Sequence, residues 1–322
     1  MKNVEQPLDP TEYSFWLPPD GMTLTTGPDN EEIVVPQILL PVHNNALKKS
    51  PQPSEKMIGE GIYDYLRRFP DCPKADKYAQ ILKTAYSFYF ADIGSQIIML
   101  EAKEVDPPYI RRKINLMKIL ALVEPENFGL LQRIGIAYFE LSMIYSELIN
   151  VRREMAAARQ WLEKARRLQP DEIGNLNYLA QICYFTGAYP QAKLYWRIIA
   201  DKLEEGESKS ELLKRIERIE TEQMPEQPLI EKLEAIGAAM EHYHIEEYAE
   251  ACIIMERLEE EGTLLCELPN PEFFYFLGLC REKTEELAAA FESYNKVLEL
   301  APQHEAAREA LDRLLDANER VK

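Results

Sequence analysis

Two small residues twelve positions apart, each within a run of helical periodicity, constrain this chain more than any other feature. In the segment 274–302 the two residues are Gly278 and Ala290. Small side chains let two antiparallel helices approach closely. Pro302 cannot continue a helix and so ends the second one. The segment therefore predicts a helical hairpin, and the large residues that would fill the space around its helices are Phe274, Leu277 and Tyr294.

The same arrangement occurs three more times upstream. The pairs are Ala180 with Ala192, Gly237 with Ala249, and Gly135 with Ala158, and large residues four positions further on are Trp196, Ile253 and Leu162. The pair that begins at Gly135 is wider by about eleven residues, and positions 140–155 contain no Gly or Pro. A helical turn takes 3.6 residues, so we expect both helices of that hairpin to be longer.

These four segments resemble the tetratricopeptide repeat (TPR) family over residues 127–302, with a degenerate, elongated repeat beginning near residue 75. A single hairpin of this kind cannot bury its own apolar face, so neighbouring copies stack. The resemblance implies an all-α, right-handed helical solenoid in which the first helix of each pair lines a concave, partner-binding surface. Such arrays serve many unrelated roles, so the resemblance alone does not define the function.

Composition narrows the function further. The formal net charge of the 322 residues is −18, with 29% charged and 46% hydrophobic residues. An acidic chain repels phosphate backbones and anionic lipid, which argues against nucleic-acid and membrane partners. No secretory signal is visible, no apolar run approaches the length of a membrane span, and the five cysteines are odd in number and scattered. These features predict a cytoplasmic protein.

The expected organisation has five parts. Residues 1–54 are rich in proline and should form an extended arm, which we expect to pack on the helical body rather than wait for a partner. Residues 55–126 should hold N-terminal helices, including one long helix over 75–105. Residues 127–206 carry the first two repeats, 207–228 a charged spacer helix and linker, and 229–322 the last two repeats with a C-terminal capping helix.

Helix starts are expected at three capping residues. Ser54 should cap the first helix and Asp171 the second repeat. The sequence Ser208-Lys209-Ser210-Glu211 has the form of a capping box and should open the spacer helix.

Catalysis finds little support in the sequence. Gly59-Glu60-Gly61 lacks the Lys-Ser/Thr of a phosphate loop, and no nucleophile elbow or zinc-protease motif is present. His242 and His244 stand beside two glutamates, but residues two apart on a helix do not face the same way. A solvated helix end is therefore the better interpretation of these histidines. We expect a protein that is not an enzyme and has no cofactor or metal.

Binding finds more support. The repeat register places amides and aromatics on the first helices of the first two repeats, which suits an extended peptide or a helix of a partner. The predicted groove residues are Gln132, Arg133, Ile136, Phe139, Asn177, Gln181, Tyr184, Phe185 and Tyr275. The register also places Glu234, Ala238 and Glu241 on the third repeat, whose face should then be acidic. Alternatively, these groups are merely solvated or covered by residues 1–54.

A cluster of basic residues interrupts the acidic balance in the elongated repeat. It could dock an acidic partner together with Arg111, Arg112 and Lys113, or it could pair with the chain's own carboxylates. The cluster consists of Arg152, Arg153, Arg159, Arg166 and Arg167.

The sequence thus predicts a non-catalytic protein-interaction module, a scaffold, adaptor or assembly factor that binds a peptide or helix in its groove. The alternative is a chaperone similar to the small acidic TPR chaperones of bacterial secretion systems, with a secreted or aggregation-prone client. The length and the N-terminal arm depart from the compact build of those chaperones.

Overall fold

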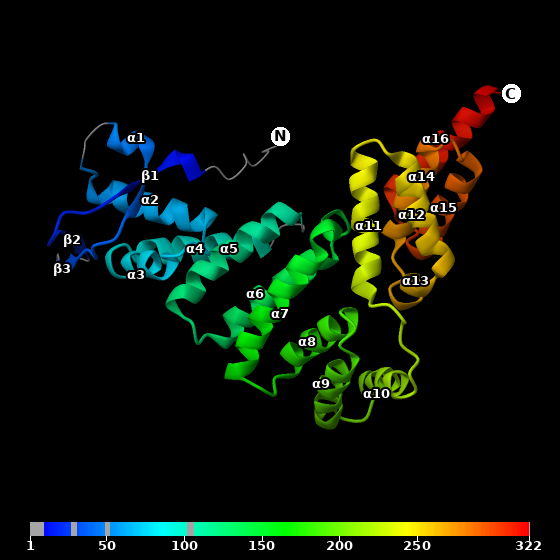
Figure 1. Ribbon diagram of the computed structural model, residues 1–322, viewed down its shortest axis with the longest axis horizontal. Coiled ribbons are helices and arrows are strands. Elements are labelled where there is room, and N and C mark those ends of the chain that lie inside the picture. Colours follow the sequence, from blue (N-terminus) through cyan, green and yellow to red (C-terminus); the bar gives the residue numbers. More distant parts are fainter. Residues whose placement is uncertain (1–9, 27–30, 49–51, 102–105, 322) are drawn as a thin grey trace. The chain divides into compact units, whose positions relative to one another are not determined.

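The computed structural model describes residues 10–26, 31–48, 52–101 and 106–321 (Figure 1). The chain divides into two compact units. Unit 1 comprises residues 1–137 with 167–169, and unit 2 comprises residues 138–166 with 170–322. No helix in the described ranges is long and apolar enough to cross a membrane.

The N-terminal segment of unit 1 is not a free arm. After a short 3-10 helix, η1 (Pro10–Glu12), its four strands pair antiparallel as β1 (Tyr13–Trp16) with β4 (Leu40–His43) and β2 (Thr23–Thr26) with β3 (Glu31–Val34). Each sheet in the described residues has two strands. Pro41 lies in β4, where a strand with a free edge tolerates the missing amide donor. This segment contacts the helices of unit 1: the Tyr78 hydroxyl donates to the Leu39 carbonyl at 2.7 Å.

The helices of unit 1 are α1 (Asn44–Leu47), α2 (Glu55–Arg68), α3 (Ala75–Ala85), α4 (Phe88–Glu101) and α5 (Pro107–Val123), followed by the first part of α6 (Phe128–Met143). Ser54 caps α2 as predicted, because its side chain accepts from the Met57 amide. Gly61 of α2 lets β4 approach: a Cβ there would lie 2.8 Å from the Val42 Cα. The glycine at the end of Gly59-Glu60-Gly61 therefore allows close packing between α2 and β4.

The single long helix expected over 75–105 is wrong. The chain breaks between α3 and α4, where Tyr86 leaves the helical conformation and is buried. Its hydroxyl donates to the Glu55 carbonyl at 2.7 Å, and its ring lies over Gly59 of α2, where an added Cβ would lie 2.8 Å from the ring. Helix α3 therefore ends at the point where the Tyr86 side chain packs on Gly59.

Unit 2 begins within α6 and continues with the 3-10 helix η2 (Tyr145–Asn150) and α7 (Val151–Leu168). Its further helices are α8 (Ile173–Phe185), α9 (Tyr189–Lys202), α10 (Glu207–Glu220), α11 (Leu229–His244), α12 (Tyr248–Glu261), α13 (Thr263–Glu267), α14 (Pro271–Lys283), α15 (Leu287–Leu300) and α16 (Glu305–Val321). The pairs α8–α9, α11–α12 and α14–α15 are helical hairpins whose two helices pack on each other.

The extra residues of the elongated repeat lengthen both helices by about one turn, as expected. Helix α6 continues eight residues beyond Gly135 and α7 begins seven residues before Ala158, against five and three residues at Ala180 and Ala192 in α8–α9. The other extra residues form η2, which packs against α11.

Two helix starts differ from the prediction. Glu172, not Asp171, caps α8 by accepting from the amides of Gly174 and Asn175, and α10 begins at Glu207 without a side-chain cap, so the expected capping box does not form.

The small-residue pairs lie at the helix contacts in two hairpins. Ala180 and Ala192 are fully buried between α8 and α9, and Gly278 and Ala290 between α14 and α15. A Cβ on Gly278 would clash with the Tyr294 ring, so Tyr294 fills the space that the glycine leaves. Both pairs are thus where the sequence placed them.

The predicted register of the third small-residue pair, Gly237 with Ala249, is wrong by two residues. Ala249 is exposed and Ile253 is 65% exposed, whereas Ala251 and Met255 are fully buried. The turns give the same register, because Glu246 adopts the left-handed conformation that Gly187 and Glu285 adopt in the other two hairpins. The small pair of α11–α12 is therefore Ala239 with Ala251, and Gly237 is free to contact another element.

Candidate partner-binding face

One side of each first helix is defined by its position relative to the small residue. The residues three before, one after and four after that residue lie within one turn-wide stripe, which we call the ligand face. On α8 it is Asn177, Gln181 and Tyr184; on α11, Ile236, Met240 and Tyr243; and on α14, Tyr275, Leu279 and Glu282.

The ligand face of α8 carries two open amides. Asn177 and Gln181 are one helical turn apart and half-buried, and neither side chain forms a hydrogen bond with any residue that the structure describes. A primary amide offers both a donor and an acceptor, which matches the groups of a peptide backbone. Two such side chains in line on a helix can hold an extended or helical segment.

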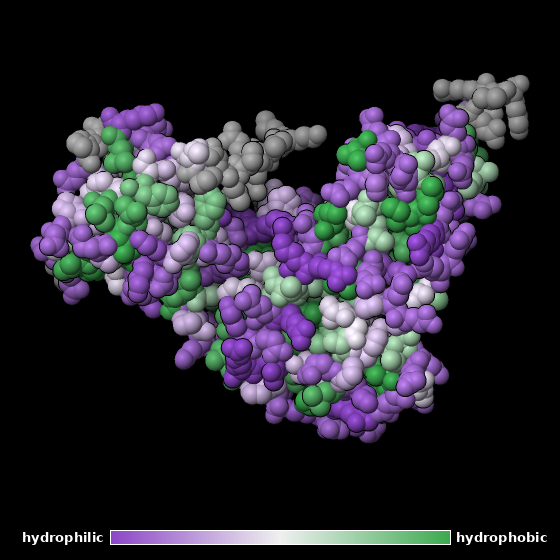
Figure 2. All heavy atoms as spheres, viewed as in Figure 1, coloured by the Kyte–Doolittle hydropathy of each residue, from purple (hydrophilic) through white to green (hydrophobic). Residues whose placement is uncertain are grey.

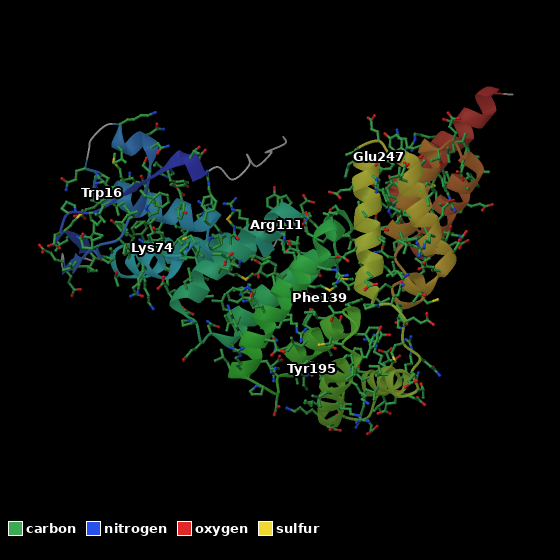
Figure 3. The ribbon with its side chains drawn as sticks, in the orientation of Figure 1. Trp16, Lys74, Arg111, Phe139, Tyr195 and Glu247 are labelled. Atoms are coloured by element: carbon green, nitrogen blue, oxygen red, sulfur yellow. The ribbon has the colours of Figure 1, made fainter. Side chains whose placement is uncertain are left out.

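The aromatic residues of the predicted groove are more enclosed than the sequence suggested. Phe139 of α6 and Phe185 of α8 are both buried, with ring centroids 6.2 Å apart (Figure 3). Tyr184 is half-buried, and its hydroxyl donates to the Glu267 carboxylate of α13 at 3.0 Å. Burial, and after it the Glu267 carboxylate, raises the pKa of Tyr184 to about 12. These three rings bind the helices of unit 2 to one another.

The ligand face of α11 is apolar, not acidic as the earlier register implied. Ile236 is buried, and so is Leu233 one turn before it. Helix η2 packs against α11, and its backbone lies against Gly237, the residue after Ile236. The Tyr243 ring packs edge-on against Phe276 of α14 at 5.5 Å.

The ligand face of α14 is engaged by α16. Tyr275 lies 5.0 Å from the His304 ring, and Glu282 accepts from Arg313 at 3.2 Å and from the Tyr294 hydroxyl. The partner-binding role assigned to Tyr275 would therefore need a ligand that reaches beside this capping helix.

Three predicted groove residues belong to the part of α6 that lies in unit 1. Gln132 is half-buried and already has a partner in the chain, and Ile136 is half-buried. Arg133 is exposed and forms an ion pair with Glu101.

The basic cluster of α7 is largely paired with the chain's own carboxylates. Arg153 pairs with Glu154 at 2.7 Å and Arg166 with Glu163 at 2.8 Å, while Arg152 pairs with Glu234 of α11. Arg159 and Arg167 are exposed. Arg111, which the sequence grouped with this cluster, lies on α5 in unit 1 (Figure 3). The five arginines of the cluster itself all lie on α7.

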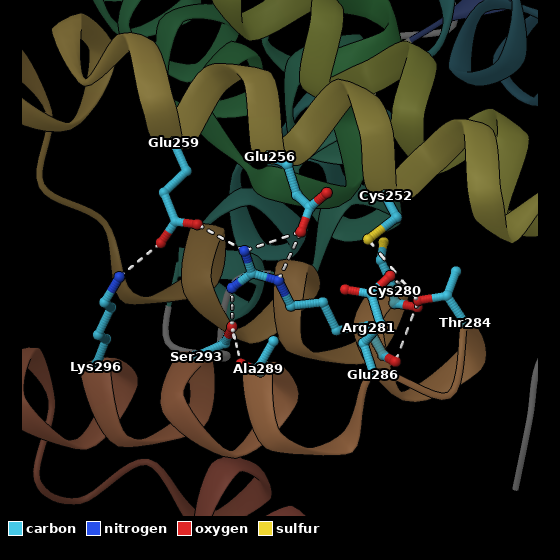
Figure 4. Close-up of polar contacts among 10 residues, drawn as sticks. All are labelled: Cys252, Glu256, Glu259, Cys280, Arg281, Thr284, Glu286, Ala289, Ser293 and Lys296. Atoms are coloured by element: carbon cyan, nitrogen blue, oxygen red, sulfur yellow. Dashed lines mark hydrogen bonds and ion pairs between the residues drawn. The ribbon is translucent and has the colours of Figure 1, made fainter.

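A second polar cluster ties the last two hairpins together. Arg281 of α14 donates to Glu256 at 3.0 Å and to Glu259 at 2.9 Å, both on α12, and to Ser293 of α15 at 2.8 Å (Figure 4). Its side chain is 12% exposed. Burial acts to raise the pKa of Glu259, but Lys296 and Arg281 together hold that pKa below its ordinary value. Every strong donor and acceptor here is matched, which indicates a structural role.

In the described part of the chain, no three His, Cys, Asp or Glu side chains are placed to hold a metal ion. His242 instead contacts the Glu247 carboxylate at 2.6 Å, at the end of α11. On the face of unit 2 shown in Figure 2, hydrophobic residues are scattered among a hydrophilic majority.

Comparison with known proteins adds little to this geometry. No family model matches the sequence, and no curated protein is significantly similar to it. Among solved structures, the chain is similar to a tetratricopeptide repeat protein from Parabacteroides merdae ATCC 43184, with 14% identity and a TM-score of 0.28 over 84% of this chain and 98% of that one. A TM-score of this size carries no argument, so the description as a helical-repeat protein stands on the hairpins themselves.

Proposed function

We propose that the chain is a non-catalytic protein-interaction module whose ligand face binds a peptide or helix of a partner protein. The observation that supports it most is the pair of open amides, Asn177 and Gln181, on a face whose other members, Glu282 excepted, are apolar or aromatic. The two amides remain accessible to water, and a partner can replace that water with direct hydrogen bonds. A partner backbone laid along α8 would do so.

The test is site-specific photo-crosslinking in the source cells. A benzophenone amino acid at position 181 should crosslink to one or a few partner proteins, and the same group at position 160, an exposed glutamine of α7, serves as the matched control. The double variant Asn177→Ala/Gln181→Ala should lose capture of the same partner at least tenfold, whereas Gln160→Ala should not. Equal capture by both variants would contradict the assignment of this face.

The chaperone alternative has one specific observation in its favour. Helix α4 of unit 1 presents Phe88, Ile98 and Met99 to solvent, with 63%, 68% and 63% of their surfaces exposed. Exposed apolar residues on one helix are typical of surfaces that bind apolar segments. Co-expression separates the two functions: a chaperone raises the soluble yield of one client, and Phe88→Ser with Met99→Ser should abolish that gain, whereas a scaffold bridges two partners at once.

A further inference from the structure

Helix η2 packs against α11 at Gly237, next to the ligand-face residue Ile236. Its backbone at Leu148 and Ile149 lies so close to Gly237 that an added Cβ would stand 2.5 Å from the Ile149 nitrogen and 2.7 Å from both the Ile149 Cα and the Leu148 carbonyl carbon. Side chains larger than glycine cannot occupy this position without moving the backbone of η2. Ile236 and Leu233, in the same stretch of α11, are buried.

The contacts of η2 have the form of a short ligand on a groove. Tyr145 at its start meets the Phe276 ring of α14 at 6.4 Å, and Leu148 is buried one turn later. Just beyond its end, Arg152 forms an ion pair with Glu234 of α11. An aromatic anchor, an aliphatic anchor and a terminal basic residue thus match an apolar face bordered by a carboxylate.

The fit of η2 is incomplete. The Tyr145 hydroxyl is buried with no hydrogen-bond partner in the described part of the chain. Ile149 stays 46% exposed, and in the Arg152–Glu234 pair the arginine side chain is 54% and the glutamate side chain 38% exposed. A buried hydroxyl without a partner opposes docking, and an exposed ion pair adds little to it.

We propose that η2 is a built-in occupant of the ligand face of α11, and that the face binds a partner segment of the same chemistry when η2 lifts away. The partner segment would have an aromatic residue, then Leu-Ile three and four positions later, and a basic residue beyond. This inference rests on the proposed function and names the partner class for one part of the face. The segment linking η2 to α6 and α7 keeps it near the face, so it competes at high effective concentration.

The experiment uses the full chain and a fluorescent peptide with the sequence of residues 143–153. Leu148→Asp places a charge in the buried position of η2 and should release it. Fluorescence anisotropy should show the peptide binding Leu148→Asp at least tenfold more tightly than the unmodified chain. A peptide with the same Leu-to-Asp change should not bind, and Gly237→Val combined with Leu148→Asp should remove binding because it fills the face. Equal binding to both chains, or none to a folded Leu148→Asp chain, would overturn the proposal.

Hydrogen exchange keeps the proposal testable if Leu148→Asp does not fold. In the unmodified protein the amides of 147–150 should exchange at least tenfold faster than those of 236–240, because η2 opens while α11 stays helical. Exchange of both segments at one rate would mean that η2 is fixed structure and would overturn the proposal. Crosslinking at position 181 reports on α8 separately, so failure of this inference and failure of the proposed function can be told apart.

Discussion

The hairpins α8–α9 and α11–α12 have the same build and opposite surfaces. Both bury a small pair twelve residues apart, Ala180 with Ala192 and Ala239 with Ala251, and both turn through one left-handed residue. Yet the ligand face of α8 carries two open amides, whereas that of α11 is apolar and has η2 packed beside it at Gly237. The spacing of small residues therefore specifies the hairpin, and the residues between them specify what lies on it.

The largest effect should come from testing the register of the second hairpin. Met255→Ala should lower the free energy of unfolding of unit 2 by about 3 kcal/mol, because a fully buried side chain leaves a cavity. Ile253→Ala, the matched control, should change it by less than about 0.5 kcal/mol. Urea unfolding followed by circular dichroism measures both. If Ile253→Ala lowered the free energy of unfolding more than Met255→Ala, the predicted register, Gly237 with Ala249, would be the correct one.

The cover on α11 gives the next largest effect. Gly237→Ala should destabilise unit 2 by about 2 kcal/mol, since the new methyl group meets the η2 backbone. The control is Gly94→Ala in α4, where nothing lies within 4 Å of the new Cβ. That change should stabilise unit 1 by roughly 0.5–1 kcal/mol, as expected for an open helical site. If Gly237→Ala also raised the stability of unit 2, η2 would not approach α11 this closely.

Two tyrosine hydroxyls sharpen the comparison further. Tyr145→Phe should stabilise unit 2 by about 1 kcal/mol, because it removes a buried group without a partner. Tyr184→Phe should destabilise it by about 1 kcal/mol, because it removes the hydrogen bond to Glu267. Thermal and urea unfolding of the two single variants, at equal pH, compare them directly. Losses of equal size would indicate that the Tyr145 hydroxyl has a partner in solution.

The smallest effect concerns the turns. Glu246→Gly and Glu285→Gly should each stabilise unit 2 by about 0.5 kcal/mol, because glycine adopts the left-handed conformation without strain. At the equivalent position of α8–α9, Gly187→Ala should cost about 1 kcal/mol for the same reason. If all three changes destabilise the unit, the glutamate side chains must make contacts of their own in the turns.

The sequence predicted the hairpins α8–α9 and α14–α15 because each has one possible register. It could not do so for α11–α12, since Gly237 with Ala249 and Ala239 with Ala251 are both small pairs twelve apart, and apolar residues follow both. The turn would have decided between them, but glutamate is not a residue that marks a left-handed position. Gly187 marks one, and there the prediction was right.

Two local features had no signal in the sequence. Residues 140–155 contain neither Gly nor Pro, so nothing indicated that the 3-10 helix η2 would form between α6 and α7. The break after α3 depends on Tyr86 turning onto Gly59, a contact 27 positions away that periodicity within one helix cannot reveal. For the site, the sequence placed Asn177 and Gln181 in the groove, and both are half-buried on α8, but it could not tell that Phe139 and Phe185 would be buried.

The Arg281 cluster has a consequence for how such an array can evolve. Its guanidinium lies on α14, its carboxylate partners on α12 and its hydroxyl partner on α15. Inserting another hairpin between α12 and α14 would separate the buried charge from both counter-ions, and losing Glu256 and Glu259 together would leave it unpaired. This junction therefore disfavours an inserted repeat, and substitutions at positions 256, 259 and 281 should be inherited together rather than singly.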